Sequence, residues 1–291
     1  MTEKKNKTIE LYPTALTIAG SDSGGGAGIQ ADLRTFNAYG VFGCSAITAI
    51  TAQNPLDITG VVNIPAAEVV RQIDTVRMEI PVKFAKSGML PDADCIAAVA
   101  DAVTKHKLEL VCDPVMVATS GNVLQKKEAL SVLKKELLPK AKWITPNIPE
   151  AEALLGKKIA NPDAQRDAAR ELYEKFGCSV LLKGGHLNCR KTAQDCVCVK
   201  GEMYVLKSPA VELDSVAESH GSGCTLSAAL TAGFAMGMSW QNALLDAKAF
   251  VLGSLRETAQ IGPDIFAMYP PTIDCTGDVS LTKAVLRKNT K

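Results

Sequence analysis

The sequence has no long hydrophobic run, and its positive and negative charges almost cancel. No stretch approaches the roughly 20 consecutive apolar residues that a membrane-spanning helix needs. The 32 Lys and Arg residues against 31 Asp and Glu residues leave a formal net charge of +1. There is therefore no basic excess of the kind that binds nucleic acid or anionic lipid. We predict a protein that acts on a small molecule, with no nucleic acid and no membrane as partner.

Patterns typical of disulfide frameworks and zinc sites are also absent. The nine cysteines are scattered, odd in number and contain no C-x-x-C pair. Most of them are expected to be small buried residues in a reducing compartment. The N-terminal MTEKKNK is polar and has no apolar segment behind it, so we expect no secretory signal. The protein is predicted to be cytoplasmic, with residues 1–13 as a flexible tail.

Short apolar runs alternate with amphipathic segments along most of the chain. The runs rich in β-branched residues predict strands at 15–19, 43–51, 83–86, 108–112, 143–145 and 179–182. Between them, apolar residues spaced three and four apart predict helices at 28–38, 66–78, 92–104, 126–137 and 164–176. This order predicts an α/β fold with a mostly parallel sheet between helices.

The last third of the chain departs from this alternation. Two β-rich stretches within 194–207 flank Gly201 and predict an antiparallel hairpin at the edge of the sheet. Two helices, at 223–236 and 240–259, are expected to close the chain. Because no repeat or low-complexity linker appears, we predict one domain over residues 1–291.

Polar and glycine-rich segments follow the predicted strands. The six strand ends read AGSDSGGGAG, TAQN, KSGM, CDPV, TPNIPE and LKGGH. In an open parallel sheet, ligands gather beyond the carboxyl ends of the strands. The sequence therefore predicts a ligand site along this edge.

Residues 20–28 form a first glycine motif, with five glycines. It lacks the Gly-Lys-Ser/Thr ending of a P-loop. Gly26-x-Gly28-x-x-Ala31 matches a dinucleotide fingerprint, so a nicotinamide-dependent oxidoreductase stays open as an alternative. Against it, the next strand ends in TAQN, without a carboxylate for a ribose hydroxyl. So many glycines favour a backbone that comes very close to a flat ligand.

Residues 219–224, SHGSGC, form a second glycine motif that runs directly into a helix of small residues. Glycines before a helix start leave backbone N–H groups pointing at one spot, where the helix dipole also favours negative charge. The motif therefore predicts an anion site. Cys224 lies at the helix start, where the pKa of a thiol tends to fall, so it is a candidate base or polarising group. Apolar packing under the helix is its alternative role.

The motifs together resemble one enzyme family. LTIAGSDSGGGAGIQADL, AITAITAQN, SGML, DPVM, ITPNIPEAEALLG, LLKGGH and SHGSGCTLSAAL, in this order, are similar to the hydroxymethylpyrimidine and phosphomethylpyrimidine kinases. They extend from residue 15 to about 232, and pyridoxal kinases share several of them. The resemblance implies a ribokinase-like, three-layer fold, ATP and Mg²⁺ as cofactors, and a homodimer.

The implied reaction is ATP-dependent phosphorylation of 4-amino-5-hydroxymethyl-2-methylpyrimidine and of its monophosphate, in thiamine diphosphate biosynthesis. A pyridoxal or pyridoxine kinase of vitamin B6 salvage is the alternative within this class. A ligand sensor without catalysis is a further alternative, because binding and turnover use nearly the same residues.

By position, the resemblance implies a pyrimidine pocket lined by Gly20, Asp32, Gln53, Met89 and Val115. Chemistry supports two of these residues, since the carboxylate of Asp32 and the amide of Gln53 suit the edge of an aminopyrimidine. A first-turn charge and a surface loop residue are their respective alternatives. Met89 and Val115 would cover the ring faces or pack in the core.

The resemblance also implies the groups that act on the nucleotide. It places Gly221, Gly223 and Cys224 around the transferred phosphoryl group, Lys183, Asn147, Glu150 and Ser222 on the nucleotide, and Glu150 and Asp113 on Mg²⁺. Much of the superfamily has an aspartate base where Cys224 stands, but a loose transition state demands no strong base. Helix capping for Asn147 and a solvated side chain for Lys183 are the alternatives.

Three other features of the sequence lie beside these motifs. His186 and His220 adjoin glycine motifs and are expected to be structural. Residues 118–122, ATSGN, could form a mobile segment that closes over the phosphate.

Overall fold

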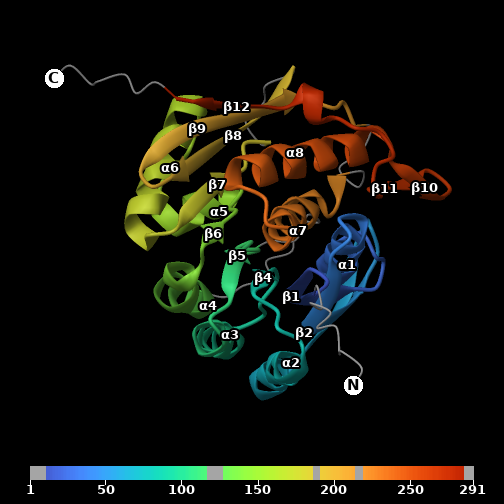
Figure 1. The fold of residues 1–291 in the computed structure, drawn as a ribbon, viewed down its shortest axis with the longest axis vertical. Helices are drawn as coiled ribbons and strands as arrows, with labels where there is room; N and C mark the ends of the chain where they lie inside the picture. The colour runs from blue at the N-terminus through green and yellow to red at the C-terminus, as the bar shows by residue number, and fades with distance from the viewer. Residues whose placement is uncertain (1–10, 117–126, 186–190, 214–218, 285–291) are drawn as a thin grey trace, which may run out of the picture.

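The computed structural model describes residues 11–116, 127–185, 191–213 and 219–284 (Figure 1). Its central feature is a ten-stranded sheet with the order β12-β9-β8-β7-β6-β5-β4-β1-β2-β3. The strands are β1 (Thr14–Asp22), β2 (Phe42–Gln53), β3 (Ile58–Asn63), β4 (Phe84–Ser87), β5 (Glu109–Cys112), β6 (Trp143–Ile144), β7 (Ser179–Leu182), β8 (Thr192–Val199), β9 (Glu202–Pro209) and β12 (Ser280–Lys283).

The middle of the sheet is parallel and both of its edges are antiparallel. β1 pairs in parallel with β2 and β4, so that Ile18 lies beside Ala46 and Ser87. β4, β5, β6 and β7 continue in parallel. β3 runs antiparallel to β2 at one edge, and β8, β9 and β12 are antiparallel at the other. The predicted mostly parallel sheet with an edge hairpin is confirmed.

Helices cover both faces of the sheet and complete three layers (Figure 1). One face carries α2 (Ala66–Glu79), α3 (Ala93–His106), α4 (Lys127–Val132), α5 (Ile148–Leu155) and α6 (Pro162–Phe176), whose apolar side chains share one large core cluster. The other face carries α1 (Gly28–Ala38), α7 (Ser222–Ala235) and α8 (Trp240–Arg256). A two-stranded ribbon of β10 (Ala259–Gly262) and β11 (Ile265–Ala267) follows α8.

Local sequence signals explain both ends of α6. The Asn161 side chain accepts a hydrogen bond from the backbone N–H of Ala164, and Pro162 occupies the first turn of α6. Gly177, with φ of 70°, ends the same helix in the left-handed conformation that glycine adopts most easily. α7 is buried along most of its length and rich in alanine, which lets it lie close to the sheet and to α8.

Four parts of the fold were not predicted. The strand β3 is mostly exposed, so its sequence shows no clear alternation. α5 has only eight residues and was not among the predicted helices. The expectation that two helices close the chain is wrong, because the β10–β11 ribbon and β12 follow α8.

The predicted tail falls largely outside the described residues, and β1 begins at Thr14. Within the described residues, no helix has both the length and the apolar character that crossing a membrane requires.

Candidate active site

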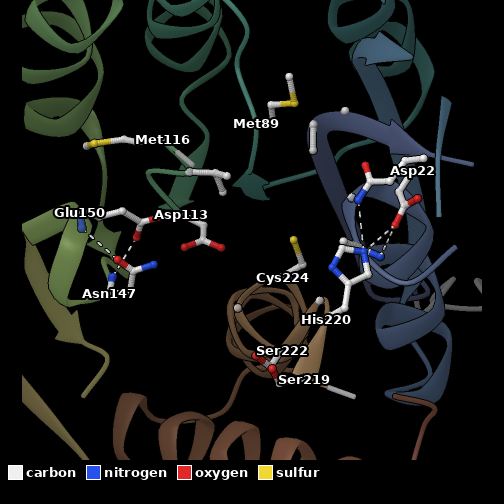
Figure 2. A pocket seen from close by; sticks show the side chains of 18 of the residues that line it. Asp22, Met89, Asp113, Met116, Asn147, Glu150, Ser219, His220, Ser222 and Cys224 are labelled. Carbon is white, nitrogen blue, oxygen red and sulfur yellow. Dashed lines mark hydrogen bonds and ion pairs between the residues drawn. The ribbon is translucent and has the colours of Figure 1, made fainter. Parts of the chain in front are cut away.

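A cavity of about 530 Å³ opens beyond the carboxyl ends of the parallel strands and at the start of α7. Residues predicted for the site account for much of its lining: Gly20, Gln53, Met89, Asp113, Val115, Asn147, Glu150, Lys183, Gly221, Ser222, Gly223 and Cys224. Figure 2 shows Asp22 and His220 on one side of the cavity, Asp113, Asn147 and Glu150 on the other, and Cys224 between them. The structure thus brings together residues that are far apart in the sequence.

Asp22 organises the first glycine motif. Its Oδ1 accepts a hydrogen bond of 2.8 Å from the backbone N–H of Gly24, and its Oδ2 accepts one of 2.8 Å from Ala27. Gly28 has φ of +58°, and a Cβ there would lie 2.3 Å from the carbonyl oxygen of Gly20. The motif is therefore a tightly folded turn that brings backbone to the rim of the cavity.

The second glycine motif packs directly against the first. Gly221 has φ of +84°, and a Cβ on it would lie 1.9 Å from the carbonyl oxygen of Gly26. A Cβ on Gly223 would lie 3.2 Å from Lys183 Nζ. No acidic side chain stands in the first turn of α7. The N–H groups of that turn, together with the Lys183 ammonium, form a site for a negatively charged group.

Asp113 and Lys183 form an ion pair beside the start of α7, where a Cβ on Gly223 would lie 3.6 Å from Asp113 Oδ2. Lys183 Nζ donates to Asp113 Oδ1 over 2.8 Å, and Thr145 Oγ1 donates to the same oxygen over 3.1 Å. Burial alone would raise the pKa of the Asp113 carboxyl, but the ammonium groups of Lys183 and Lys86 outweigh it and hold this pKa below its usual range. Asp113 is therefore a carboxylate.

Asn147 and Glu150 start α5 as a capping box. The Asn147 side chain accepts from the backbone N–H of Glu150 over 2.9 Å, and Glu150 Oε2 accepts from the backbone N–H of Asn147 over 2.8 Å. The capping role is thus confirmed, and both residues still line the cavity. Burial raises the pKa of Glu150 to about 7, against the opposing effect of Lys183.

The thiol of Cys224 points into the cavity between the two sides (Figure 2). Burial raises its pKa, and this outweighs the lowering effect of Lys86 and of the Gly28 N–H. The tendency toward a low pKa at a helix start does not prevail here, because the partial burial of Cys224 favours the neutral thiol. Cys224 is therefore a neutral thiol at physiological pH.

Because its thiol is neutral, we predict that Cys224 does not act as a general base. We expect Cys224→Ser to keep kcat within about tenfold of the wild type, since at most one weak hydrogen bond is altered. The measurement is kcat against pH for both proteins. A limb in the wild-type profile that rises with thiolate formation, and that Cys224→Ser lacks, would show that the thiolate takes part in the reaction.

Asp32 is the one predicted site residue that the structure places outside the lining of the cavity. Its carboxylate is fully buried, with Lys86 Nζ at 2.8 Å from both oxygens and Thr17 Oγ1 donating over 2.6 Å. Burial alone would lower the pKa of Lys86, but the Asp32 carboxylate outweighs it and raises that pKa. A carboxylate paired in this way has no free face for a ligand.

Asp22, Thr51 and His220 line the cavity but were not predicted as site residues. Asp22 and His220 each stand inside a glycine motif, and this position was the available signal. Among the described residues, no group of three or more His, Cys, Asp and Glu side chains is arranged to hold a metal ion. His186 and residues 118–122 lie outside the described part of the chain.

A mostly parallel three-layer fold, with an anion site at a helix start beyond the strand ends, defines a ribokinase-like small-molecule kinase. The family model for phosphomethylpyrimidine kinase matches residues 22–268, and the chain belongs to this family. Over 251 residues it is 45% identical to the hydroxymethylpyrimidine/phosphomethylpyrimidine kinase of Haemophilus influenzae, a match covering 85% of this chain and 92% of the relative.

Two further similarities support the assignment. The chain is 41% identical over 250 residues to the thiamine biosynthesis bifunctional protein ThiED of Geobacter sulfurreducens, covering 86% of this chain and 50% of that one. The pyridoxal kinase of Staphylococcus aureus in complex with AMP-PCP superposes with a TM-score of 0.84 at 30% identity, over 94% of this chain and 100% of that chain. Family membership replaces the nicotinamide-oxidoreductase alternative.

Proposed function

We propose that the protein transfers the γ-phosphoryl group of ATP to the hydroxymethyl group of 4-amino-5-hydroxymethyl-2-methylpyrimidine, and then to the resulting monophosphate, in thiamine diphosphate biosynthesis. The observation that carries the proposal is the pairing of two features in one cavity. The amide of Gln53 suits an aminopyrimidine edge, and the N–H groups at the start of α7 suit a phosphate. The names of the relatives agree with this reaction.

The pyrimidine would lie against the first glycine motif. Gln53 offers both a donor and an acceptor to the ring edge, as an aminopyrimidine requires. Met89 and Val115 offer apolar contact to the ring faces. A Cβ on Gly20 would lie 3.3 Å from Met89 Sδ, so glycine here leaves room for both the methionine and the ring.

The phosphate would lie against the second glycine motif. In the reaction, the substrate hydroxyl oxygen forms a bond to the γ-phosphorus, the bond from phosphorus to the β,γ-bridging oxygen breaks, and ADP leaves with that electron pair. The N–H groups from Gly221 to Cys224 and the Lys183 ammonium would stabilise negative charge on the transferred group and on ADP. The hydroxyl proton is lost late, to a phosphate oxygen or to water, so a neutral Cys224 serves to position the hydroxyl.

Asp113 and Glu150 fit a hydrated Mg²⁺ that also binds nucleotide phosphates. Mg²⁺ usually takes one or two carboxylates and completes its shell with water and phosphate oxygens. Burial raises the pKa of Glu150, and bound Mg²⁺ would favour its charged form. When bound, the ion neutralises phosphate charge. Asn147 and Ser222 would complete the nucleotide side.

The substrate assignment is tested by ADP release coupled to a reporter enzyme. We expect turnover with the pyrimidine alcohol and its monophosphate, and a kcat/KM at least about tenfold lower with pyridoxal, because its ring lacks the amino group that Gln53 would bind. Chelation of Mg²⁺ should abolish turnover. Preferred turnover of pyridoxal would favour the vitamin B6 alternative, and ligand binding without any ADP release would favour a sensor.

We further propose a cytoplasmic homodimer. The free cysteines of the described chain suit a reducing compartment. The edge strand β3 exposes Val61 (44%) and Val62 (65%), and Ile50 on the paired strand is 51% exposed. An exposed apolar edge strand favours pairing with another chain. Sedimentation equilibrium gives the mass in solution, and a monomer at micromolar concentration would contradict the dimer.

A further inference from the structure

His220 contacts both parts of the cavity that the proposed reaction must bring together, although phosphoryl transfer assigns it no task. Its Nε2 lies 3.0 Å from Asp22 Oδ2 and 3.2 Å from Gln53 Nε2. Its ring also fills the space at Gly26, where a Cβ would lie 2.5 Å from His220 Cδ2. The side chain of His220 is only 10% exposed. It therefore joins the first glycine motif, the end of β2 and the second glycine motif.

The partners of Asp22 determine which imidazole nitrogen carries a hydrogen. An ionised carboxylate only accepts hydrogen bonds. The backbone N–H groups of Gly24 and Ala27, which can only donate, each give a hydrogen bond of 2.8 Å to one oxygen of Asp22 and so favour the ionised carboxylate. Asp22 is thus ionised, and the Nε2 atom that faces it must carry a hydrogen. His220 Nε2 is a donor.

Thr51 flanks the other end of the Gln53 amide. Its Oγ1 lies 2.9 Å from the carbonyl oxygen of Ser21 and 3.0 Å from Gln53 Oε1. The hydroxyl has a single hydrogen, and a backbone carbonyl only accepts. If the hydrogen goes to Ser21, a lone pair of Thr51 faces the amide. A donor at His220 and an acceptor at Thr51 therefore bracket Gln53.

The two ends of an amide have nearly the same shape, and its orientation follows from its hydrogen-bond partners. With Gln53 Nε2 facing His220 Nε2, two donors face each other. Turning the amide by 180° brings its carbonyl oxygen to His220, which donates to it, and brings its NH₂ group to Thr51, which accepts from it. We infer that His220 and Thr51 fix the polarity of the Gln53 amide, with its carbonyl oxygen on the His220 side and its NH₂ group on the Thr51 side. Both are positioning residues that determine specificity.

This polarity has a consequence for the substrate, which rests on the proposed function. The amide oxygen would accept from the 4-amino group of the pyrimidine, and the amide NH₂ would donate to the adjacent ring nitrogen. The amino group then lies toward His220. The hydroxymethyl group, on the next ring carbon, lies beyond it toward Gly221, where the phosphate would bind. The opposite polarity would turn the hydroxymethyl group away from the second glycine motif.

A matched pair of variants tests the role of Thr51. Thr51→Val keeps the side-chain shape but removes the hydroxyl, so we expect the KM for the pyrimidine alcohol to rise about tenfold. The KM for ATP should stay unchanged, and Thr51→Ser, which keeps the hydroxyl, should restore the wild-type values. An equal rise of both KM values in Thr51→Val would indicate a merely structural role and overturn the inference.

The protonation of His220 can be observed without substrate. The chain has three histidines, so the imidazole nitrogens of His220 can be assigned in proton–nitrogen correlation spectra by comparison with His220→Ala. We expect a hydrogen on Nε2 at neutral pH. An unprotonated Nε2 would overturn the inference whatever the kinetics show.

The two proposals can fail separately. If the wild-type protein does not phosphorylate the pyrimidine, the proposed function fails, while the spectra still decide the state of His220. If the wild type phosphorylates it and Thr51→Val keeps its KM, the polarity inference fails and the function stands.

Discussion

Gly221→Ala is expected to lower kcat/KM by at least about a hundredfold, comparable to the loss of an oxyanion-hole donor. The added Cβ would lie 1.9 Å from the carbonyl oxygen of Gly26, and the residue would also keep φ of +84°. A contact this short cannot persist, because neither atom belongs to a flexible side chain. The start of α7 must move away from the first glycine motif, and its N–H groups leave the proposed position of the phosphate.

Gly237→Ala is the matched control for backbone strain. Gly237 follows α7 and has φ of +77°, with nothing within 4 Å of an added Cβ. It shares the unfavourable backbone conformation but not the clash, so we expect a stability loss of about 1 kcal/mol and unchanged kcat/KM. Steady-state kinetics and thermal unfolding of both variants separate the two effects. Near-normal turnover in Gly221→Ala would contradict the proposed phosphate site.

Lys86→Met is expected to lower the free energy of unfolding by about 3–5 kcal/mol, as when one partner of a buried ion pair is removed. Lys86 and Asp32 are both fully buried, and the substitution would leave the Asp32 carboxylate without its cation. Burial of an unpaired charge is unfavourable, and water enters such a site only at the expense of packing. Chemical denaturation gives the free energy directly.

Two controls accompany this variant. Lys105→Met removes the cation from an ion pair with Asp74 in which the lysine side chain is 60% exposed, so we expect less than about 1 kcal/mol. The double variant Lys86→Met with Asp32→Leu replaces both buried charges by apolar groups, and should regain most of the lost stability. A single Lys86→Met variant as stable as the wild type would show that the pair is not important for the fold.

The sequence predicted the sheet and the edge that carries the cavity because both depend on local patterns. Buried β-branched runs and helical periodicity are visible within about 15 residues. The glycines and polar residues at the strand ends mark the cavity without knowledge of their partners. By contrast, β3 and β12 are short and largely exposed, so little in their composition distinguishes them from loops.

Pairing between distant residues was beyond sequence reasoning. Asp32 suits an aminopyrimidine as well as Gln53 does, and only the position of Lys86, 54 residues away, explains why it lies beneath the cavity. Similarly, His220 seemed a structural residue beside a turn, because its partner Asp22 is 198 residues distant. Electrostatic neighbours of this kind become known only when the topology is known.

The close packing of the two glycine motifs also affects the stage of protein synthesis at which the enzyme becomes active. One motif lies at the end of the first strand and the other begins α7, and Asp22 and His220 in these motifs are 198 residues apart. A nascent polypeptide that has left the ribosome only as far as β9 would hold the turn around Asp22 without His220 or Gly221 to pack against it. Catalytic ability would therefore arise abruptly, once the last third of the chain has been synthesised and has docked.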